Sequence, residues 1–249
     1  MNRWKLRLFV ALAVISAAVF VRLGFWQLSR RQERRTRNAL VAARLDSTPV
    51  GVASLPRDTA LARFRRVRVA GVPDYEHELV WAARTHKGSP GVNLLTPVRL
   101  PGSDTAILLN RGWVYSGDGA TVDLAKWRDR DSTFVGYVEE LPSIAGASYT
   151  DRPSVIARLS HGVVAKALPY PVLPIYVVVL SDSAIAADRI ARLSAPPLDE
   201  GPHLSYAFQW FAFATVALVG VGIVLRQPRS SAEAKPDARV ADDEGRVRR

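Results

Sequence analysis

The chain has 249 residues, a formal net charge of +11 and no cysteine. The lack of cysteine excludes disulfides, iron–sulfur ligation, c-type haem attachment and thiol catalysis, and it argues against delivery of Cu(I), which prefers thiolate and thioether ligands. Much of the basic charge lies beside two apolar segments, where Lys and Arg usually meet lipid phosphates. We therefore expect membrane lipids, and no nucleic acid, among the partners.

The first apolar segment covers residues 8–28 and contains only three polar side chains. At 1.5 Å per residue it reaches about 31 Å, the thickness of a bilayer core, so it predicts a transmembrane helix after a cytoplasmic segment at residues 1–7. A cleaved signal peptide is the alternative, because Ser16–Ala18 resembles a weak cleavage site. The apolar run continues past that site, which favours an anchor. Residues 30–44 lack Pro and Gly and are expected to prolong the helix.

Residues 29–202 predict a domain of mainly β (α+β) character. Short runs of alternating or continuous apolar residues are separated by turn residues rich in Gly and Pro. The first two runs are expected to pair around Gly71–Asp74, and the next two around Pro101–Asp104. About six strands favour a sheet sandwich or a small barrel over a helical bundle. The expected strands are Phe64–Val69, Glu76–Arg84, Val92–Leu100, Thr105–Val114, Thr133–Glu139 and Ile175–Leu180.

The second apolar segment, residues 203–225, predicts another transmembrane helix. The cations that follow it place the C-terminus in the cytoplasm by the positive-inside rule, and two spans then place the N-terminus there too. The Arg-rich stretch after the first span opposes this orientation, but long domains translocate largely regardless of charge. The expected protein lies in the cell membrane, with the central domain periplasmic or otherwise extracytoplasmic. Residues 226–249 are expected to form a disordered cytoplasmic tail.

Few residues in the central domain form a pattern that indicates chemistry. The chain has no nucleophile elbow, phosphate loop or zinc-protease signature, so an enzyme, including a hydrolase, is not expected. Glu76–Glu78 contains a His between two Glu, but on a strand the Glu side chains would face away from the His, which favours a solvated surface over a metal site. Asn110–Trp113 ends a strong strand and has two interpretations. Gly112 either makes a bulge with Trp113 packed in the core, or Arg111 and Trp113 are presented to a partner.

The second span suggests a cofactor site at its outer end. His203 is followed at helical spacing by Tyr206, Trp210 and Phe213, which we place on roughly one face. A neutral imidazole beside an aromatic wall can ligate haem iron while the rings pack against the macrocycle. The alternative is a boundary histidine within an interfacial aromatic belt.

Two residues lie at matching depth below the outer boundary of the spans. Counting inward places Arg22 and Gln209 each roughly 9 Å below it. Arg22 could pair with Gln209 or with a haem propionate, or it could extend to the outer headgroups. Trp26 lies at this level as well, and the two spans together predict that His203 meets the segment Gly24–Gln27 near the outer leaflet.

Four segments in this order resemble the surfeit locus protein 1 family, assembly factors of cytochrome c oxidase. The resemblance runs through most of residues 8–226. Its motifs are Gly24–Leu28 with Arg30, Arg84–Pro97, Asn110–Val114 and Glu200–Phe211.

The resemblance implies a non-enzymatic role in oxidase maturation, assisting haem a insertion into subunit I. It implies His203 as the iron ligand. Tyr206, Trp210, Trp26, Gln27 and Arg22 are the further residues that we expect to bind haem. The expected partners are subunit I of cytochrome c oxidase and, as a second candidate, haem a synthase. A membrane-tethered docking or structural module without haem is the competing hypothesis.

Overall fold

The computed structural model describes residues 3–128, 132–149, 151–180 and 190–226. These residues form two compact units, which are described separately: a helix pair (residues up to Gln32 and from Gly201) and a β domain (Glu33–Glu200). The predicted disordered tail lies outside the described residues from position 227 onward.

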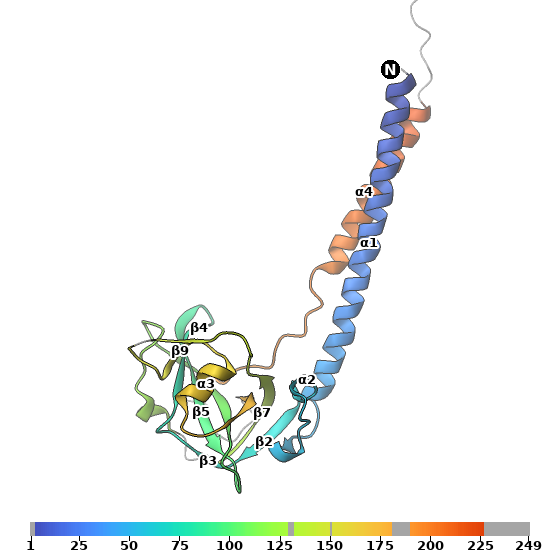
Figure 1. Cartoon of the computed structure of the whole chain (residues 1–249). Coiled ribbons are helices and arrows are strands. Elements are labelled where there is room, and N and C mark those ends of the chain that lie inside the picture. The colour runs from blue at the N-terminus through green and yellow to red at the C-terminus, as the bar shows by residue number, and fades with distance from the viewer. Residues whose placement is uncertain (1–2, 129–131, 150, 181–189, 227–249) are drawn as a thin grey trace, which may run out of the picture. The chain divides into compact units, whose positions relative to one another are not determined.

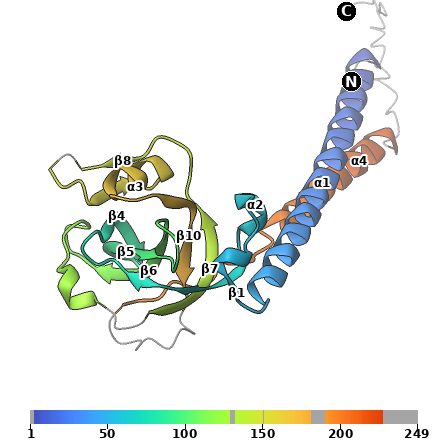
Figure 2. The same ribbon diagram turned by 60° about the horizontal axis from the view of Figure 1, so that its bottom comes forward.

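The helix pair consists of α1 (Arg3–Leu45) and α4 (His203–Arg226). Both helices contain a stretch long and apolar enough to cross a membrane, judged by length and composition. They run antiparallel along each other (Figures 1 and 2). The predicted architecture, two apolar terminal helices flanking a mainly β domain, is confirmed.

A seam of small and bulky residues joins the two helices. On α1 the half-buried and buried positions recur at alternating intervals of four and three residues, and α4 repeats the pattern. This is the spacing of helices that pack at a shallow angle. Small residues in the seam let the two backbones approach closely. The seam positions are Leu6, Val10, Ala13, Ala17, Phe20, Gly24 and Gln27 on α1, and His203, Ala207, Trp210, Ala214, Ala217 and Val221 on α4.

α1 continues to Leu45, which confirms the predicted prolongation of the first helix. Its last turns belong to the β domain. Val41 is buried there, and Arg44 donates hydrogen bonds to the carbonyl oxygens of Ala60 and Arg63 at 3.2 and 2.9 Å. Arg35 forms an ion pair of 2.8 Å with Glu200 at the other end of the domain.

The β domain is built on one sheet of ten strands, ordered β1-β2-β7-β10-β6-β5-β4-β9-β8, with β3 paired to β5. The pairs β1–β2, β6–β10 and β4–β9 are parallel and the others are antiparallel. The strands therefore join into a single mixed sheet and not two separate ones. The strands are β1 Val50–Gly51, β2 Arg66–Ala70, β3 Val72–Pro73, β4 Leu79–His86, β5 Ser89–Arg99, β6 Ala106–Tyr115, β7 Thr133–Glu140, β8 Ala147–Ser148, β9 Val155–Arg158 and β10 Val172–Val179.

Four short helical segments pack against the sheet. They are α2 (Thr59–Ala62) and α3 (His161–Ala167), which Figure 2 labels, and the 3-10 turns η1 (Val52–Ser54) and η2 (Leu124–Trp127). One core cluster combines alternate residues of β2, β6, β7 and β10 with Ala62 of α2. A second cluster packs Val164 of α3 against Leu79, Leu95 and Leu108. Alternation along the strands assigns neighbouring residues to opposite faces, so both faces of the central strands are covered.

All six predicted strands are present, but one predicted pairing is wrong. β2 pairs with β1 and β7, and not with β4 across the Gly71–Asp74 turn. The second pairing, β5 with β6 around Pro101–Asp104, is confirmed. The alternation in the first strand is also confirmed, because Val67 and Val69 are fully buried.

The segment Glu76–Glu78 is a second correction. Glu76 and His77 form a turn before β4 begins at Leu79, so the strand argument applied to them was wrong. Two other histidines of the domain lie at the ends of regular elements, since His86 ends β4 and His161 begins α3.

Candidate functional site

The outer end of the helix pair brings His203 and Gln27 together. His203 is the first residue of α4, and its Nδ1 lies 2.8 Å from Oε1 of Gln27. An amide oxygen only accepts hydrogen bonds, so this contact requires the proton of the imidazole on Nδ1. The lone pair of the other ring nitrogen, Nε2, is then the one available to a metal.

Aromatic side chains from both helices pack below this contact. Trp210 stacks on Phe20, with ring centroids 5.7 Å apart, and Phe213 contacts both rings at 5.8 and 5.9 Å. Offset and edge-on pairs of this kind stabilise a contact beyond the area they bury. The seam beneath His203 is therefore held by rings that pack on one another.

Gly24 makes the close approach of the helices possible. A Cβ atom at this position would lie 2.5 Å from the ring of Phe211, which itself meets Phe25 edge-on at 5.5 Å. The neighbouring seam residue Ala207 is 1% exposed. Phe20, Gly24 and Phe211 were not predicted as site residues, although the alternating spacing of small residues could have indicated them.

The other predicted residues lie on the outside of the pair. Tyr206 and Trp26 are each 48% exposed. Trp26 and Arg22 are four residues apart on one face of α1, and the guanidinium of Arg30 lies 5.7 Å from the Trp26 ring. Arg22 and Gln209 are both exposed, and among the described residues neither has a side-chain hydrogen bond. Of the predicted set, His203, Gln27 and Trp210 thus belong to the seam, whereas Tyr206, Trp26 and Arg22 border it.

In the β domain, the Asn110–Trp113 segment buries its arginine. Leu94 pairs with Gly112 and Leu95 with Asn110, so Arg111 is the extra residue of a β-bulge. Gly112 has φ +133°, and a Cβ there would lie 2.5 Å from the carbonyl oxygen of Ala191. The bulge interpretation is confirmed, and the presentation of Arg111 to a partner is wrong because its side chain is fully buried.

Arg111 is bound on every side within the sheet. Its Nη2 pairs with Oε1 of Glu78 at 2.5 Å, and its Nε donates to Oγ1 of Thr96 at 2.7 Å. Thr96 in turn donates to the same carboxylate, and the ring of Tyr75 lies 5.1 Å from the guanidinium carbon. A buried charge with this many partners holds β4, β5 and β6 in register.

A cavity of about 240 Å³ opens beside the bulge. Trp113 borders it, with Nε1 donating to the carbonyl of Arg84 at 3.3 Å and the His86 ring 5.3 Å away. Burial raises the pKa of Tyr176 to about 12, so its hydroxyl is protonated at neutral pH. The other residues that line this cavity include Trp81, Asn93, Asn110, Tyr137 and Glu139.

Comparison with known proteins identifies the family. The model of the SURF1 family matches residues 14–215, from the first span through the second. The chain belongs to the SURF1 family. This matched range contains His203, Gln27 and the buried Arg111, so both regions described above lie within the family match.

Relatives match over most of the chain. A SURF1-like protein of Mycobacterium bovis is 27% identical over 227 residues, covering 86% of this chain and 82% of the relative. A SURF1-like protein of Rickettsia felis is 25% identical over 222 residues, covering 86% and 95%. Surfeit locus protein 1 of Gallus gallus is 30% identical over 107 residues, which are 37% of this chain and 35% of the relative. Membership of the SURF1 family suggests a role in cytochrome c oxidase assembly and not in catalysis.

Proposed function

We propose that this protein is an assembly factor that holds haem a at the His203 end of its helix pair and assists its insertion into subunit I of cytochrome c oxidase. The observation that carries the proposal is the contact between His203 and Gln27. By accepting a hydrogen bond from Nδ1–H, Gln27 orients the imidazole and leaves the Nε2 lone pair for a metal. A second residue that orients a ligating histidine is the usual support of a metal-binding imidazole.

The residues around His203 fit a haem in chemistry and in exposure. Tyr206 and Trp26 present aromatic surface on the outside of the pair, where a flat apolar macrocycle can pack. Arg22 lies one turn below Trp26 on α1 and supplies a cation for a propionate. When bound there, haem a would be the group delivered to the oxidase, and these side chains would hold and orient it.

The membrane orientation that this role needs has both termini in the cytoplasm. Arg3 near the start of α1 and Leu225 near the end of α4 line one groove, which supports this orientation. Arg226 and the cations after it favour the cytoplasmic side. His203 and the β domain then lie on the outer side, where the domain is available to dock subunit I or haem a synthase.

Haem content of the purified full chain tests the proposal. When purified from cells that make haem a, the wild-type protein should show a Soret band. The haem content of His203→Ala should be lower by a factor of about ten or more. His86→Ala is the matched control, because it removes a histidine from the β domain and should leave haem content unchanged. Equal haem content in His203→Ala and wild type would remove His203 from the role.

The absence of a Soret band in every version would instead favour the docking module without haem. The cavity beside Trp113 is the observation that favours that alternative, since it offers polar and aromatic groups in the β domain. Deletion of the gene separates the two at the level of the cell. Loss of haem a from oxidase in isolated membranes, restored by wild type but not by His203→Ala, supports haem delivery, whereas restoration by both supports docking.

A further inference from the structure

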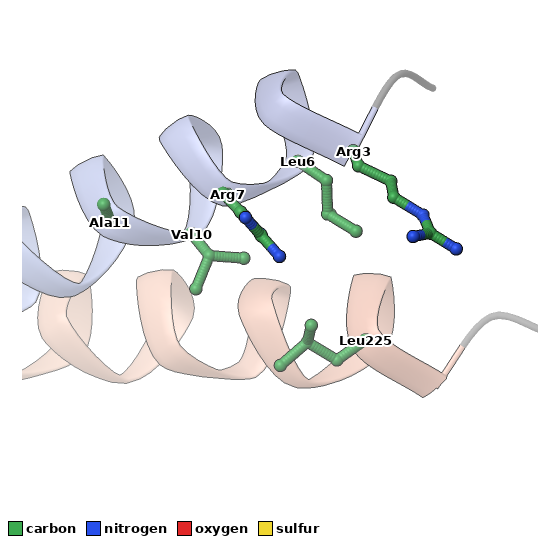
Figure 3. A pocket seen from close by; sticks show the side chains of 6 residues that line it. All are labelled: Arg3, Leu6, Arg7, Val10, Ala11 and Leu225. Carbon is green, nitrogen blue, oxygen red and sulfur yellow. The ribbon is translucent and has the colours of Figure 1, made fainter.

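The opposite end of the helix pair holds a groove between the first turns of α1 and the last turn of α4. It has a volume of about 530 Å³. Figure 3 shows its lining: Arg3, Leu6, Arg7, Val10 and Ala11 from α1, facing Leu225 of α4. Arg3 and Arg7 are four residues apart, so they lie one turn apart on the same face of the helix.

Within the described part of the helix pair, the two guanidinium groups in this groove have no carboxylate to pair with. Neither Arg3–Gln32 nor Gly201–Arg226 contains an Asp or a Glu. Within the described residues, neither Arg3 nor Arg7 makes a hydrogen bond or an ion pair with its side chain. No side chain in the described residues thus neutralises the two charges of the groove.

The position of the groove selects the kind of anion. Arg7 immediately precedes the apolar run that begins at Leu8, and Trp4, 58% exposed, supplies the amphipathic ring typical of a membrane boundary. The cations thus lie at the level of lipid phosphates. Leu6, Val10 and Leu225 continue the groove toward the apolar part of the helices, where acyl chains run.

We propose that this groove is a binding site for one anionic phospholipid. Arg3 and Arg7 bind its phosphate, as guanidinium groups do in bidentate fashion, and the apolar floor contacts the first part of an acyl chain. The site is separate from the His203 end and does not depend on haem binding.

Lys5 provides a matched control on the same helix. It carries the same charge at the same membrane level, but it does not line the groove, and its ammonium lies 6.0 Å from the Trp4 ring. Residues two apart on a helix do not face the same direction. Lys5→Gln therefore removes general attraction to an anionic surface without touching the site.

The test is lipid retention by the delipidated full chain, measured by native mass spectrometry after addition of phosphatidylglycerol or phosphatidylcholine. We expect wild type to retain one phosphatidylglycerol in preference to phosphatidylcholine. Arg7→Gln should weaken retention about fivefold and the double variant Arg3→Gln/Arg7→Gln about 30-fold, whereas Lys5→Gln should stay within about twofold of wild type.

Two results would overturn the proposal. Equal loss in Lys5→Gln and Arg7→Gln would mean that the basic helix end attracts anionic lipid without a site. Equal retention of phosphatidylglycerol and phosphatidylcholine would mean that the groove binds acyl chains and does not recognise the phosphate. Neither result affects the haem proposal, which is measured at His203.

Discussion

The β domain and the helix pair differ in where their arginines lie and in whether a carboxylate neutralises them. Arg111 is the largest fully buried side chain of the protein's described residues, and Glu78, lying just before β4, neutralises it. In the helix pair, Arg3–Gln32 and Gly201–Arg226 contain no acidic residue, so Arg3, Arg7 and Arg22 have no carboxylate partner there. The domain uses a buried ion pair to order its own strands, whereas Arg3, Arg7 and Arg22 of the helix pair have exposed side chains.

The seam of the helix pair is consistent with this division. Its tightest positions are small or aromatic, and a hydrogen bond between His203 and Gln27 joins the two helices at its end. Packing of small and aromatic side chains along the seam holds the helices together. The following variants test whether charge is structural in one region and functional in the other.

The largest effect is expected from Arg111→Met in the β domain. The substitution leaves the Glu78 carboxylate buried without its cation, which should lower the free energy of unfolding by about 3–5 kcal/mol. Pulse proteolysis of the full chain in detergent across a urea series measures it. The control is the double variant Arg111→Met/Glu78→Gln, which removes both charges and should recover more than half of the loss. An equally unstable double variant would show that shape, and not charge pairing, sets the requirement for Arg111.

In the helix pair, Gly24→Leu should disturb the seam next to Phe211. The new side chain has no room, since even its Cβ would lie 2.5 Å from the ring, and we expect a loss of about 1–3 kcal/mol. Gly220→Leu is the control, because no atom lies within 4 Å of a Cβ at that position. Resistance of the full chain to SDS, followed by tryptophan fluorescence, measures both. Similar midpoints for the two variants would contradict a seam held by close approach at Gly24.

Gln27→Leu should reduce haem content about tenfold, through His203. The substitution keeps the seam apolar and removes the oxygen that orients the imidazole, and loss of such a partner typically weakens metal binding by 10–100-fold. Gln209→Leu makes the same chemical change on an exposed face of α4 and should leave haem content at the wild-type level. If both variants bind haem equally, the hydrogen bond has no part in holding the cofactor.

Contacts that depend on strong local patterns could be predicted from the sequence. The two apolar spans fix depth by length alone, so the meeting of His203 with the Gly24–Gln27 segment was predictable although the residues lie far apart in the chain. Period-2 alternation likewise located β2, and its buried Val67 and Val69. The partner of β2 was not predictable, because β7 is remote in sequence and the nearer turn at Gly71 suggested β4 instead.

The role of Arg111 illustrates the remaining gap. The glycine after it indicated a bulge, but its burial depends on Glu78, 33 positions away, and on Thr96 of the neighbouring strand. A single sequence does not show that such a carboxylate faces the same point of the sheet. The buried side of α4 is a further case, since the sequence grouping of Tyr206 with His203 did not indicate that the seam follows Ala207 and Trp210.

The smallest effect concerns Asp74, which precedes β4 in the turn that was expected to join two strands. Partial burial disfavours its charge, but hydrogen bonds from Tyr170 Oη at 2.7 Å and from His77 outweigh this and lower the pKa of Asp74 below the usual 3.8. A carboxyl with a lowered folded-state pKa stabilises the fold above its unfolded pKa, and this contribution disappears as the pH falls through the folded value.

Asp74→Asn should therefore lower the free energy of unfolding by up to about 1 kcal/mol at pH 7 and by almost nothing near pH 2. The exposed Asp104→Asn is the control for charge alone, and urea unfolding of the full chain at both pH values would compare them. A cost for Asp74→Asn that is the same at pH 7 and pH 2 would mean that the side-chain shape matters in this turn, and that its ionised carboxylate does not stabilise the domain.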